Sequence, residues 1–451
     1  MADTATRPLS RTHRIALILL AGLLLAFGVL VLWRSALLTR RMGDLDCFLR
    51  PAWAALTGVG LYDLTTENNW HYSYPPLYAI LMVPLADPPL DHDRTGYVPY
   101  PVSVLVIYLL NMACLFVAVH VLASALERQS LDPAVRSQPR FCRRWWALRV
   151  WPALICLVPI LHSAMRGQVN LQILALLSVW IACSLGRWRM CGGVSLAGAA
   201  CIKVIPIYLL VYPLWGRDAR TLAGCAAGLF AGVVLVPVAF FGPTRAIDEY
   251  RRYGEVFLGP VLNLSANDSR QHELLGVDAT DSMGVKHALH SWINRDPFHR
   301  PKEYHPAVTA AYGVLGVLMT LAVLWPARPG ADSKPAPDGL VPGLLLLLMV
   351  FFSPTSHLHY FMFSIPLIMS LLLRHWQYRP TLRIGWPLGL TLLWFAVATG
   401  LPEVPDMWQL RDLRMPLLGA LPLWAFGVTE LWRGQRTAAA RRIAAPASIA
   451  A

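Results

Sequence analysis

The chain has 451 residues, of which 56% are hydrophobic and only 14% are charged, and its formal net charge is +13. Soluble domains carry roughly 25% charged residues, so this composition argues against a water-soluble protein and predicts one that lies in a lipid bilayer. The positive charge does not indicate a nucleic-acid partner, because the arginines cluster between apolar runs instead of forming one continuous basic face.

Ten apolar runs are long enough, or nearly so, to cross a bilayer, for which about 20 residues suffice. The first run is too long for the core of a signal peptide and is expected to remain as a helix. We therefore predict an all-α polytopic membrane protein with about 10–12 transmembrane helices. The predicted spans are 15–33, 99–124, 146–165, 169–187, 220–242, 306–326, 340–353, 358–374, 383–400 and 414–432.

Two further apolar segments are predicted to enter the membrane without crossing it. Residues 75–86 form a short segment with three prolines, and residues 191–215 are interrupted by Lys203 and Pro206. Irregular backbone at membrane depth is tolerated only where protein or water satisfies its hydrogen bonds. Both segments are therefore expected to be re-entrant or broken helices.

The positive-inside rule then orients the chain in the cell membrane. If both irregular segments return to the side they entered from, the short arginine-rich loops and both termini are cytoplasmic. The external loops are 34–98 and 243–305, and Arg34, Arg40 and Arg41 are the exceptions to the rule. Residues 1–433 are predicted to form one transmembrane domain, and residues 434–451 are predicted to form a disordered cytoplasmic tail.

The first external loop carries two carboxylates, Asp44 and Asp46, shortly after the first span. At positions i and i+2 they fit a general base or the ligands of a metal ion, and a pair of solvated loop acids is the simpler alternative. The residues that follow, 48–56, are predicted to form a helix on the membrane surface.

Aromatic residues and two prolines precede the first irregular segment, in the run Trp70-His71-Tyr72-Ser73-Tyr74-Pro75-Pro76-Leu77-Tyr78. One interpretation is a rigid amphipathic wall of a binding site, with Tyr74 as a contact residue. The other is an interfacial belt of aromatic side chains.

A tight external turn between two spans carries Arg166, Gln168 and Asn170, and Lys203 lies in the later broken helix. A lysine in an apolar segment needs an anionic partner or a water-filled cavity, and phosphate is a suitable anion because an ammonium binds it as a point charge. The alternative is that the Lys203 side chain extends to the membrane surface.

Another external turn carries His357 and His359. Histidines at i and i+2 suit a metal less well than histidines at i and i+4 on a helix, so a catalytic role and a structural pair of turn histidines both stay open. All four polar groups are predicted on the same, non-cytoplasmic side. Acid, imidazole, amide and cation gathered there indicate an active site that opens sideways to lipid.

In their order and spacing these motifs resemble glycosyltransferase family 87, membrane-embedded enzymes of the GT-C superfamily that are related to mycobacterial polyprenol-phosphate-mannose-dependent mannosyltransferases. The local turn that usually reads G-x-D-P-Y-D differs here. The motifs that carry the resemblance are Asp44-x-Asp46, Ala54-Ala55-Leu56, Gly58, Tyr62-Asp63, Tyr74-Pro75-Pro76-Leu77, Arg166 to Asn170, Leu196 to Ala200 with Ile202-Lys203 and Pro206, and Ser353-Pro354 with His357, His359 and Tyr360.

The resemblance implies a GT-C type bundle that transfers a sugar, with mannose expected, from a polyprenyl phosphate to a hydroxyl of a lipid or polysaccharide. The transfer would invert the configuration at the anomeric carbon and would take place on the outer face of the membrane. Asp44 matches the base and Asp46 is the second choice, while His357 or His359 would assist. The donor phosphate and sugar would be bound by Arg166, Gln168, Asn170, Lys203 and Tyr74.

No cofactor is expected, and the cysteines show neither a CxxC pair nor a zinc-site spacing. A divalent cation shared by Asp44 and Asp46 stays open. The main alternative function is a transporter or flippase of a lipid-linked or anionic substrate, because transporters also place charges in broken helices. The one-sided placement of the polar groups favours a transferase, and a different lipid-linked transferase or a non-catalytic assembly protein also stays open.

Overall fold

The computed structural model describes residues 5–38, 41–66, 69–261, 274–277, 279–328, 339–379 and 381–443. Within these residues the regular elements are helices, apart from two isolated bridges. Five helices are long and apolar enough to cross a membrane, and a bent pair makes a sixth span if it is counted as one. The predicted all-α polytopic fold is confirmed.

Each of the ten predicted spans coincides with one helix or with a run of consecutive helices. In chain order these are α1 (Arg11–Ala36), α4 (Tyr100–Gln129), α6 (Arg143–Ile155) with α7 (Leu157–Arg166), α8 (Asn170–Leu185), α11 (Ala219–Leu229) with η3 (Phe230–Leu235) and α12 (Val236–Phe241), α17 (Pro306–Leu324), α18 (Leu340–Phe351), η5 (Leu358–Ser364) with α19 (Ile365–Trp376), α20 (Trp386–Gly400) and α22 (Met415–Ile443). Several of these helices are shorter than the apolar run that predicted them.

The predicted span 146–165 is not one straight helix. It consists of α6 and α7, which meet at an angle of 64°. The break follows from Pro159, which lacks the N–H that would bond the carbonyl of Ile155, the last residue of α6. The bend directs the end of α7, with Arg166, toward the start of α2.

The second irregular segment is broken as predicted, whereas the first is one short helical run. The first is α3 (Pro76–Met82) followed by the short turn η1 (Val83–Leu85), and the second is α9 (Arg189–Ile202) followed by η2 (Ile205–Leu210) and α10 (Val211–Trp215). Lys203 ends α9 with extended backbone angles. The lysine therefore lies in a helix break.

Helices α9 and α11 pack closely because glycines line their contact. A Cβ on Gly193 would lie 2.1 Å from the carbonyl oxygen of Thr221, and one on Gly224 would lie 2.1 Å from that of Met190. Small residues let helices approach in a membrane, where apolar burial alone does not hold them together. This contact fixes the helix that carries Lys203.

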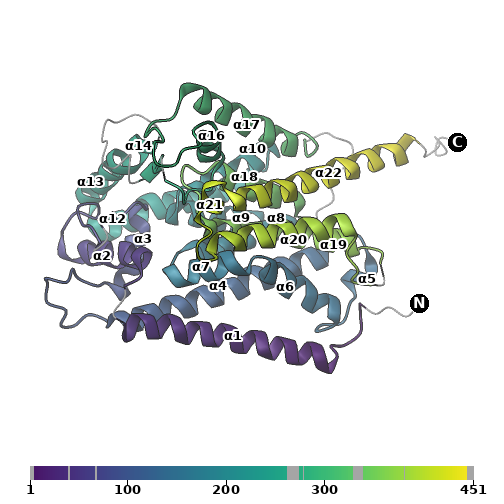
Figure 1. Cartoon of the computed structure of the whole chain (residues 1–451), viewed down its shortest axis with the longest axis horizontal. Coiled ribbons are helices and arrows are strands. Elements are labelled where there is room, and N and C mark those ends of the chain that lie inside the picture. Colours follow the sequence, from purple (N-terminus) through teal and green to yellow (C-terminus); the bar gives the residue numbers. More distant parts are fainter. Residues whose placement is uncertain are drawn as a thin grey trace.

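The remaining helices gather at one end of the bundle. They are α2 (Gly43–Thr57), α13 (Pro243–Tyr253), η4 (Gly254–Leu258), α14 (Gly259–Val261), α16 (Val285–Ile293), η6 (Leu401–Glu403) and α21 (Trp408–Asp412). The short helix α5 (Pro133–Arg136) lies at the other end, where α1 begins and α22 finishes (Figure 1). Residues 262–273 of the predicted external loop 243–305 lie outside the described part.

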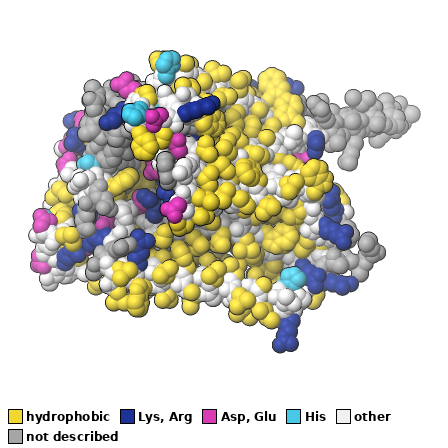
Figure 2. Space-filling model, in the orientation of Figure 1, with side chains coloured by type: hydrophobic (Ala, Val, Ile, Leu, Met, Phe, Trp, Pro, Cys, Tyr) yellow, Lys and Arg dark blue, Asp and Glu magenta, His cyan; other side chains and the backbone are white. Residues whose placement is uncertain are grey.

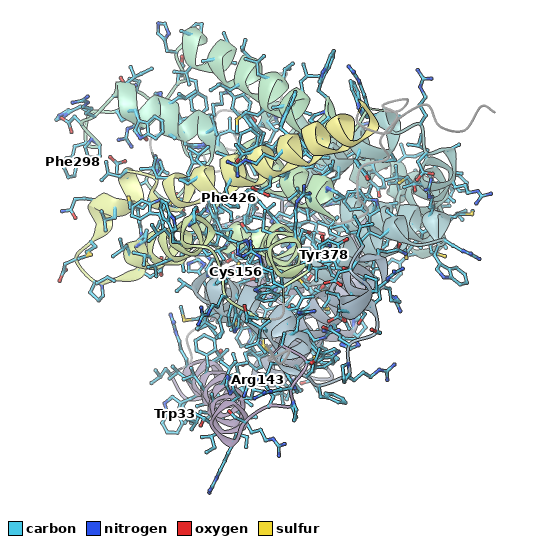
Figure 3. All side chains as sticks on the ribbon, turned by 90° about the vertical axis from the view of Figure 1, so that its right-hand side faces the viewer. Trp33, Arg143, Cys156, Phe298, Tyr378 and Phe426 are labelled. Carbon is cyan, nitrogen blue, oxygen red and sulfur yellow. The ribbon has the colours of Figure 1, made fainter. Side chains whose placement is uncertain are left out.

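The surface matches a membrane location. Hydrophobic side chains cover the middle of the face in Figure 2, and charged side chains gather toward its two ends. Seen from the end at which α22 finishes, side chains project outward from α1 and α22 (Figure 3). The predicted tail begins inside α22, which continues to Ile443, and residues 444–451 lie outside the described part.

One prediction about the first loop was wrong. The helix expected on the membrane surface at 48–56 is α2, which begins five residues earlier and is largely buried against the rest of the protein. Its start at Gly43 places Asp44 and Asp46 in the first turn of a helix and not in a loop. Carboxylates are stabilised there by the positive end of the helix dipole.

Candidate active site

Asp44 forms an ion pair with Arg166 that joins two of the predicted polar groups. Arg166 is the last residue of α7; its Nη2 lies 3.3 Å from Asp44 Oδ1, and its Nε also donates to Oδ2. The side chain of Asp44 is 14% exposed and that of Arg166 is 41% exposed. The pair is therefore sheltered but reachable from outside.

Gly167 permits this approach. Its φ of +71° ends α7 in the left-handed region, which favours glycine. A Cβ at this position would lie 2.8 Å from Cβ of Leu45 on α2. Both the turn and the close contact with α2 explain why glycine follows Arg166.

Asp46 belongs to a different cluster from Asp44. Its Oδ2 accepts from Arg41 Nε at 2.7 Å, and the same guanidinium bonds Asp87 and lies 4.1 Å from the ring centroid of Tyr100. Residues two apart on a helix point about 200° from one another around its axis, which separates the two carboxylates. The structure therefore does not bring Asp44 and Asp46 into one pair.

Lys203 sits in a buried network with three of the other predicted residues. Its Nζ donates to Asn170 Oδ1 at 3.2 Å and to the hydroxyl of Tyr74 at 3.4 Å, and the Tyr74 hydroxyl donates to Gln168 Oε1 at 3.4 Å. The ammonium also lies 4.2 Å from the ring centroid of Tyr360, a cation–π contact. The ammonium is thus held inside the protein, and the alternative that its side chain extends to the membrane surface does not apply.

The histidines of the later turn lie next to this network. The ring of His359 packs edge-on against Tyr360, with centroids 4.9 Å apart, and stacks on His162 at 5.4 Å. The ring centroids of His357 and His359 are 5.6 Å apart, and Nδ1 of His357 is 3.6 Å from Asp281 Oδ2. The turn therefore connects the lysine network to α7.

Burial lowers the pKa of the His357 imidazole below its ordinary value. Asp281 and Asp44 oppose that shift, whereas Arg166 and Lys203 add to it. The field at His357 thus contains contributions from carboxylates and cations on several separate segments of the chain. At neutral pH the imidazole is uncharged and can donate or accept a hydrogen bond.

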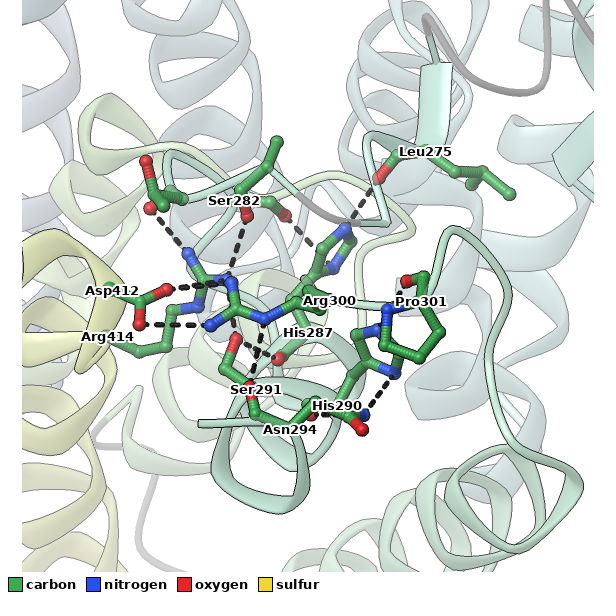
Figure 4. Close-up of polar contacts among 12 residues, drawn as sticks. Leu275, Ser282, His287, His290, Ser291, Asn294, Arg300, Pro301, Asp412 and Arg414 are labelled. Carbon is green, nitrogen blue, oxygen red and sulfur yellow. Dashed lines mark hydrogen bonds and ion pairs between the residues drawn. The ribbon is translucent and has the colours of Figure 1, made fainter. Parts of the chain in front are cut away.

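The segment that carries Asp281 is anchored by a buried polar network (Figure 4). Arg300 donates to both carboxylate oxygens of Asp412, at 2.8 and 3.0 Å, and Arg414 donates to Ser291 Oγ at 2.7 Å. His287 Nε2 lies 2.6 Å from the carbonyl oxygen of Leu275. These contacts hold the segment that carries Asp281 against the start of α22.

A cavity of about 420 Å³ opens beside the ion pair. Its lining comes mainly from the end of α1, the start of α2 and the end of α7, with one residue each from the loop before α3 and from η6. The lining residues are Val31, Arg34, Ser35, Arg41, Met42, Gly43, Asp44, Trp70, His162, Met165, Arg166 and Glu403. The space beside Lys203 and Asn170 is only about 10 Å³, room for about one water molecule. Of the predicted site residues, Asp44 and Arg166 line the open cavity, while Lys203 lies behind it.

Two buried polar atoms of the site have no hydrogen-bond partner among the described residues, Asn170 Nδ2 and His359 Nε2. Buried polar groups are nearly always paired, by protein, water or ligand. Both atoms are therefore positions at which a bound molecule or water would be stabilised.

Several residues at the site were not predicted from the sequence. His162 lies one helical turn before Arg166, and an imidazole inside an apolar run at that spacing was the available signal. Arg34 and Arg41 appeared only as exceptions to the positive-inside rule, and they line the cavity. Asp281 carried no local signal, because its partner His357 is remote in sequence.

The described residues contain no group of three or more His, Cys, Asp or Glu side chains placed to hold a metal ion. Asp44 and Asp46 are each bonded to a different arginine, Arg166 and Arg41. The two carboxylates thus do not fit the shared cation that the sequence left open.

Comparison with known proteins agrees with this arrangement of motifs. The model of glycosyltransferase family 87 matches residues 72–354, more than half of the chain. The chain belongs to glycosyltransferase family 87. It is therefore an enzyme that transfers a sugar, as its motifs predicted, and no solved structure matches it.

Named relatives are mycobacterial. A polyprenol-phosphate-mannose-dependent alpha-(1-2)-phosphatidylinositol mannoside mannosyltransferase of Mycobacterium tuberculosis is 30% identical over 48% of this chain, and the match spans half the length of that relative. A polyprenol-phosphate-mannose-dependent alpha-(1-2)-phosphatidylinositol pentamannoside mannosyltransferase of Mycolicibacterium smegmatis is 27% identical over 79% of this chain and 76% of that protein. A Mycobacterium tuberculosis protein of the same description is 25% identical over 91% of this chain and 84% of that protein.

Proposed function

We propose that this glycosyltransferase moves a mannosyl residue from a polyprenyl phosphate to a hydroxyl of a glycolipid acceptor, with inversion, on the non-cytoplasmic side of the cell membrane. The observation that carries the proposal is the ion pair of Asp44 and Arg166 at the edge of the 420 Å³ cavity, which puts a base and a cation in one place. The donor and the acceptor class come from the names of the relatives.

In this reaction Asp44 accepts the proton of the acceptor hydroxyl while the hydroxyl oxygen attacks the anomeric carbon of the mannosyl donor. The bond between that carbon and the phosphate oxygen breaks, and the polyprenyl phosphate leaves with the bonding electrons. Arg166 binds the phosphate, on which negative charge increases as the bond breaks. Fixed donors directed at developing charge are usually the strongest catalytic contribution.

The surrounding groups support these two residues. Arg34 and Arg41 line the same cavity and add positive charge for the phosphate. Asp46 keeps Arg41 in place and does not act as the base. His162 lines the cavity one helical turn before Arg166, His359 stacks on it and His357 lies next to His359, so these imidazoles would bind acceptor hydroxyls.

Lys203 would act from behind the cavity. With Tyr74, Gln168 and Asn170 it forms the wall next to Arg166, and it adds a positive charge that is also felt at His357. Direct contact between Lys203 and the donor phosphate would require this wall to open, because only about 10 Å³ is free beside it.

The lipid tail of the donor has a route into the site. Three residues of the cavity wall, Val31, Arg34 and Ser35, belong to α1. This helix is the least buried of the long apolar helices and exposes large hydrophobic side chains along its length. The polyprenyl chain would therefore lie in lipid beside α1 while its phosphate enters between α1 and α7.

The test is transfer of radiolabelled mannose from polyprenyl-phosphate mannose to a membrane lipid extract by the purified full-length protein. Asp44→Asn keeps the shape of the side chain but removes the base, so transfer is expected to fall by at least about a hundredfold. Asp63→Asn, which changes a half-exposed carboxylate that pairs with Arg252, is the matched control and is expected to retain activity.

Normal transfer by Asp44→Asn would show that the base is elsewhere. If the unsubstituted protein transfers no mannose, then mannose is not the transferred sugar, and other polyprenyl-phosphate sugars are tested next. Movement of the lipid-linked sugar across the vesicle membrane, without any mannosyl transfer, would instead support the transporter alternative.

A further inference from the structure

A second large cavity lies at the opposite end of the bundle from Asp44. Its volume is about 760 Å³. It is lined by residues of the second half of α4, of α5 and the loop after it, and of the start of α6: Phe116, His120, Val121, Ser124, Glu127, Arg128, Val135, Arg136, Gln138, Arg140, Phe141, Trp145 and Trp146. Tyr100 and Glu127 are separated by about 40 Å along α4, so this cavity is remote from the active site.

The cavity has an excess of positive charge. Arg128, Arg136 and Arg140 are exposed at its rim, and none of them has a carboxylate partner among the described residues. Glu127 is the one carboxylate in the lining, and both of its oxygens accept from Arg149, at 2.7 and 3.0 Å. Glu127 is thus neutralised by Arg149, and the three rim arginines remain available to an anion.

The lining changes from charged to apolar along α4. Phe116 is 68% exposed and lies on the same helix as Glu127, about 16 Å nearer the middle of the bundle. On the other wall Phe141 is 60% exposed and Trp145 and Trp146 adjoin it, and Arg149 fixes Trp145 by a cation–π contact at 3.9 Å. Tryptophans are typical of the headgroup level of a membrane.

We propose that this cavity is a binding site for an anionic phospholipid of the nearer leaflet. The rim arginines bond the phosphate oxygens, which guanidinium groups bind in a bidentate manner. The upper part of an acyl chain lies along Phe116 and Val121. A free phosphate would use the arginines only, whereas a phospholipid also uses the apolar wall, and the absence of an unpaired carboxylate in the lining fits binding better than catalysis.

The test uses the full-length protein released from nanodiscs of mixed phosphatidylglycerol and phosphatidylcholine, with bound lipids counted by native mass spectrometry. The variant is Arg128→Gln/Arg136→Gln/Arg140→Gln. Its matched control, Arg217→Gln/Arg220→Gln/Arg328→Gln, removes the same charge from exposed arginines outside the cavity. Each basic residue near an anionic lipid surface strengthens binding by roughly fivefold, so retention of phosphatidylglycerol is expected to weaken by at least about tenfold in the variant only.

Equal retention by the variant and the unsubstituted protein would overturn the proposal, as would equal retention of the two lipids or an equal loss in the control. Displacement of the lipid by soluble glycerol phosphate at low concentration would identify a simple phosphate site instead. If the triple variant does not fold, a photoreactive phosphatidylglycerol is crosslinked to the unsubstituted protein. Crosslinks are expected in the peptides that contain Phe116 and Phe141, and crosslinks only elsewhere would contradict the site.

Discussion

At the scale of single residues, Asp44 and Arg166 depend on one another. The carboxylate is mostly buried and the guanidinium donates to both of its oxygens, so each group neutralises the other. A substrate phosphate that binds Arg166 would compete for part of this contact and leave Asp44 freer to accept a proton. In the proposed mechanism the ion pair would therefore link donor binding to the readiness of Asp44 as the base.

Arg166→Gln is expected to lower mannosyl transfer by about a hundredfold or more, because it removes a cation directed at the leaving phosphate. Arg166→Lys should retain part of the activity, since it keeps the charge but not the forked geometry. The activities of both variants are measured as initial rates of mannosyl transfer at saturating donor. Arg252→Gln, which breaks an exposed pair with Asp63, is the control, and an Arg166→Gln enzyme as active as that control would remove Arg166 from the site.

His287 makes the stability of the segment around α16 dependent on pH. Burial lowers its pKa from 6.5 to about 3, since the imidazole is fully enclosed, although its hydrogen bond to the Leu275 carbonyl opposes that shift. Between these values the unfolded chain binds a proton that the folded protein does not, so stability falls as the pH drops below 6.5. At pH 5 the loss is about 2 kcal/mol.

The expected result is a lower thermal unfolding midpoint for the unsubstituted protein at pH 5 than at pH 7. The difference should be smaller in His287→Gln, although this variant is less stable at every pH. His299→Gln changes an exposed imidazole and should behave like the unsubstituted protein. Parallel pH profiles for all three proteins would show that His287 does not control the segment.

At the scale of elements, the contact of α9 with α11 supports the active site from a distance. It holds α9 so that Lys203 emerges at the break beside Asn170. The contact depends on glycines that leave no room for a side chain. A change there should disturb the lysine network without touching any substrate.

Gly224→Val is expected to reduce the yield of monodisperse protein severalfold, because its side chain would clash with the backbone of Met190. Size-exclusion chromatography in detergent measures this yield. Gly389→Val on α20 is the matched control, since a Cβ there meets nothing within 4 Å. If both variants behave alike, the close approach of α9 and α11 is not what the glycine provides.

At the scale of the whole molecule, the two ends of the bundle have different chemistry. One end carries the carboxylates, the histidines and the cavity of the proposed active site, and the other carries the arginine-rich rim of the second cavity. Helix α1 begins and α22 finishes at that second end (Figure 1). The positive-inside rule then predicts that the second end is cytoplasmic.

Maleimide labelling tests this orientation. Of the eight cysteines only Cys191 is exposed, at the start of α9 on the predicted cytoplasmic side. In intact cells an impermeant maleimide should leave the unsubstituted protein unlabelled until the membrane is permeabilised. Asp93→Cys, in the exposed loop before α4, should be labelled at once, and the opposite pattern would reverse the topology.

The family and the general plan of the membrane segments followed from the sequence alone. The cost of placing a residue in lipid is set mainly by that residue, so apolar runs, prolines and Lys203 were enough to predict the spans and the broken helix. Short motifs such as Arg166 to Asn170 are local as well, which is why they identified glycosyltransferase family 87. They also named the residues that surround Lys203.

Only the tertiary structure decided how these residues are paired. Asp44 and Arg166 are 122 positions apart, and the bend between α6 and α7 and the early start of α2 bring them together. The separation of Asp44 from Asp46, the position of His162 and the enclosure of Lys203 also depend on which face each helix turns inward. Such orientations result from the packing of distant helices, and no single segment of the sequence contains that information.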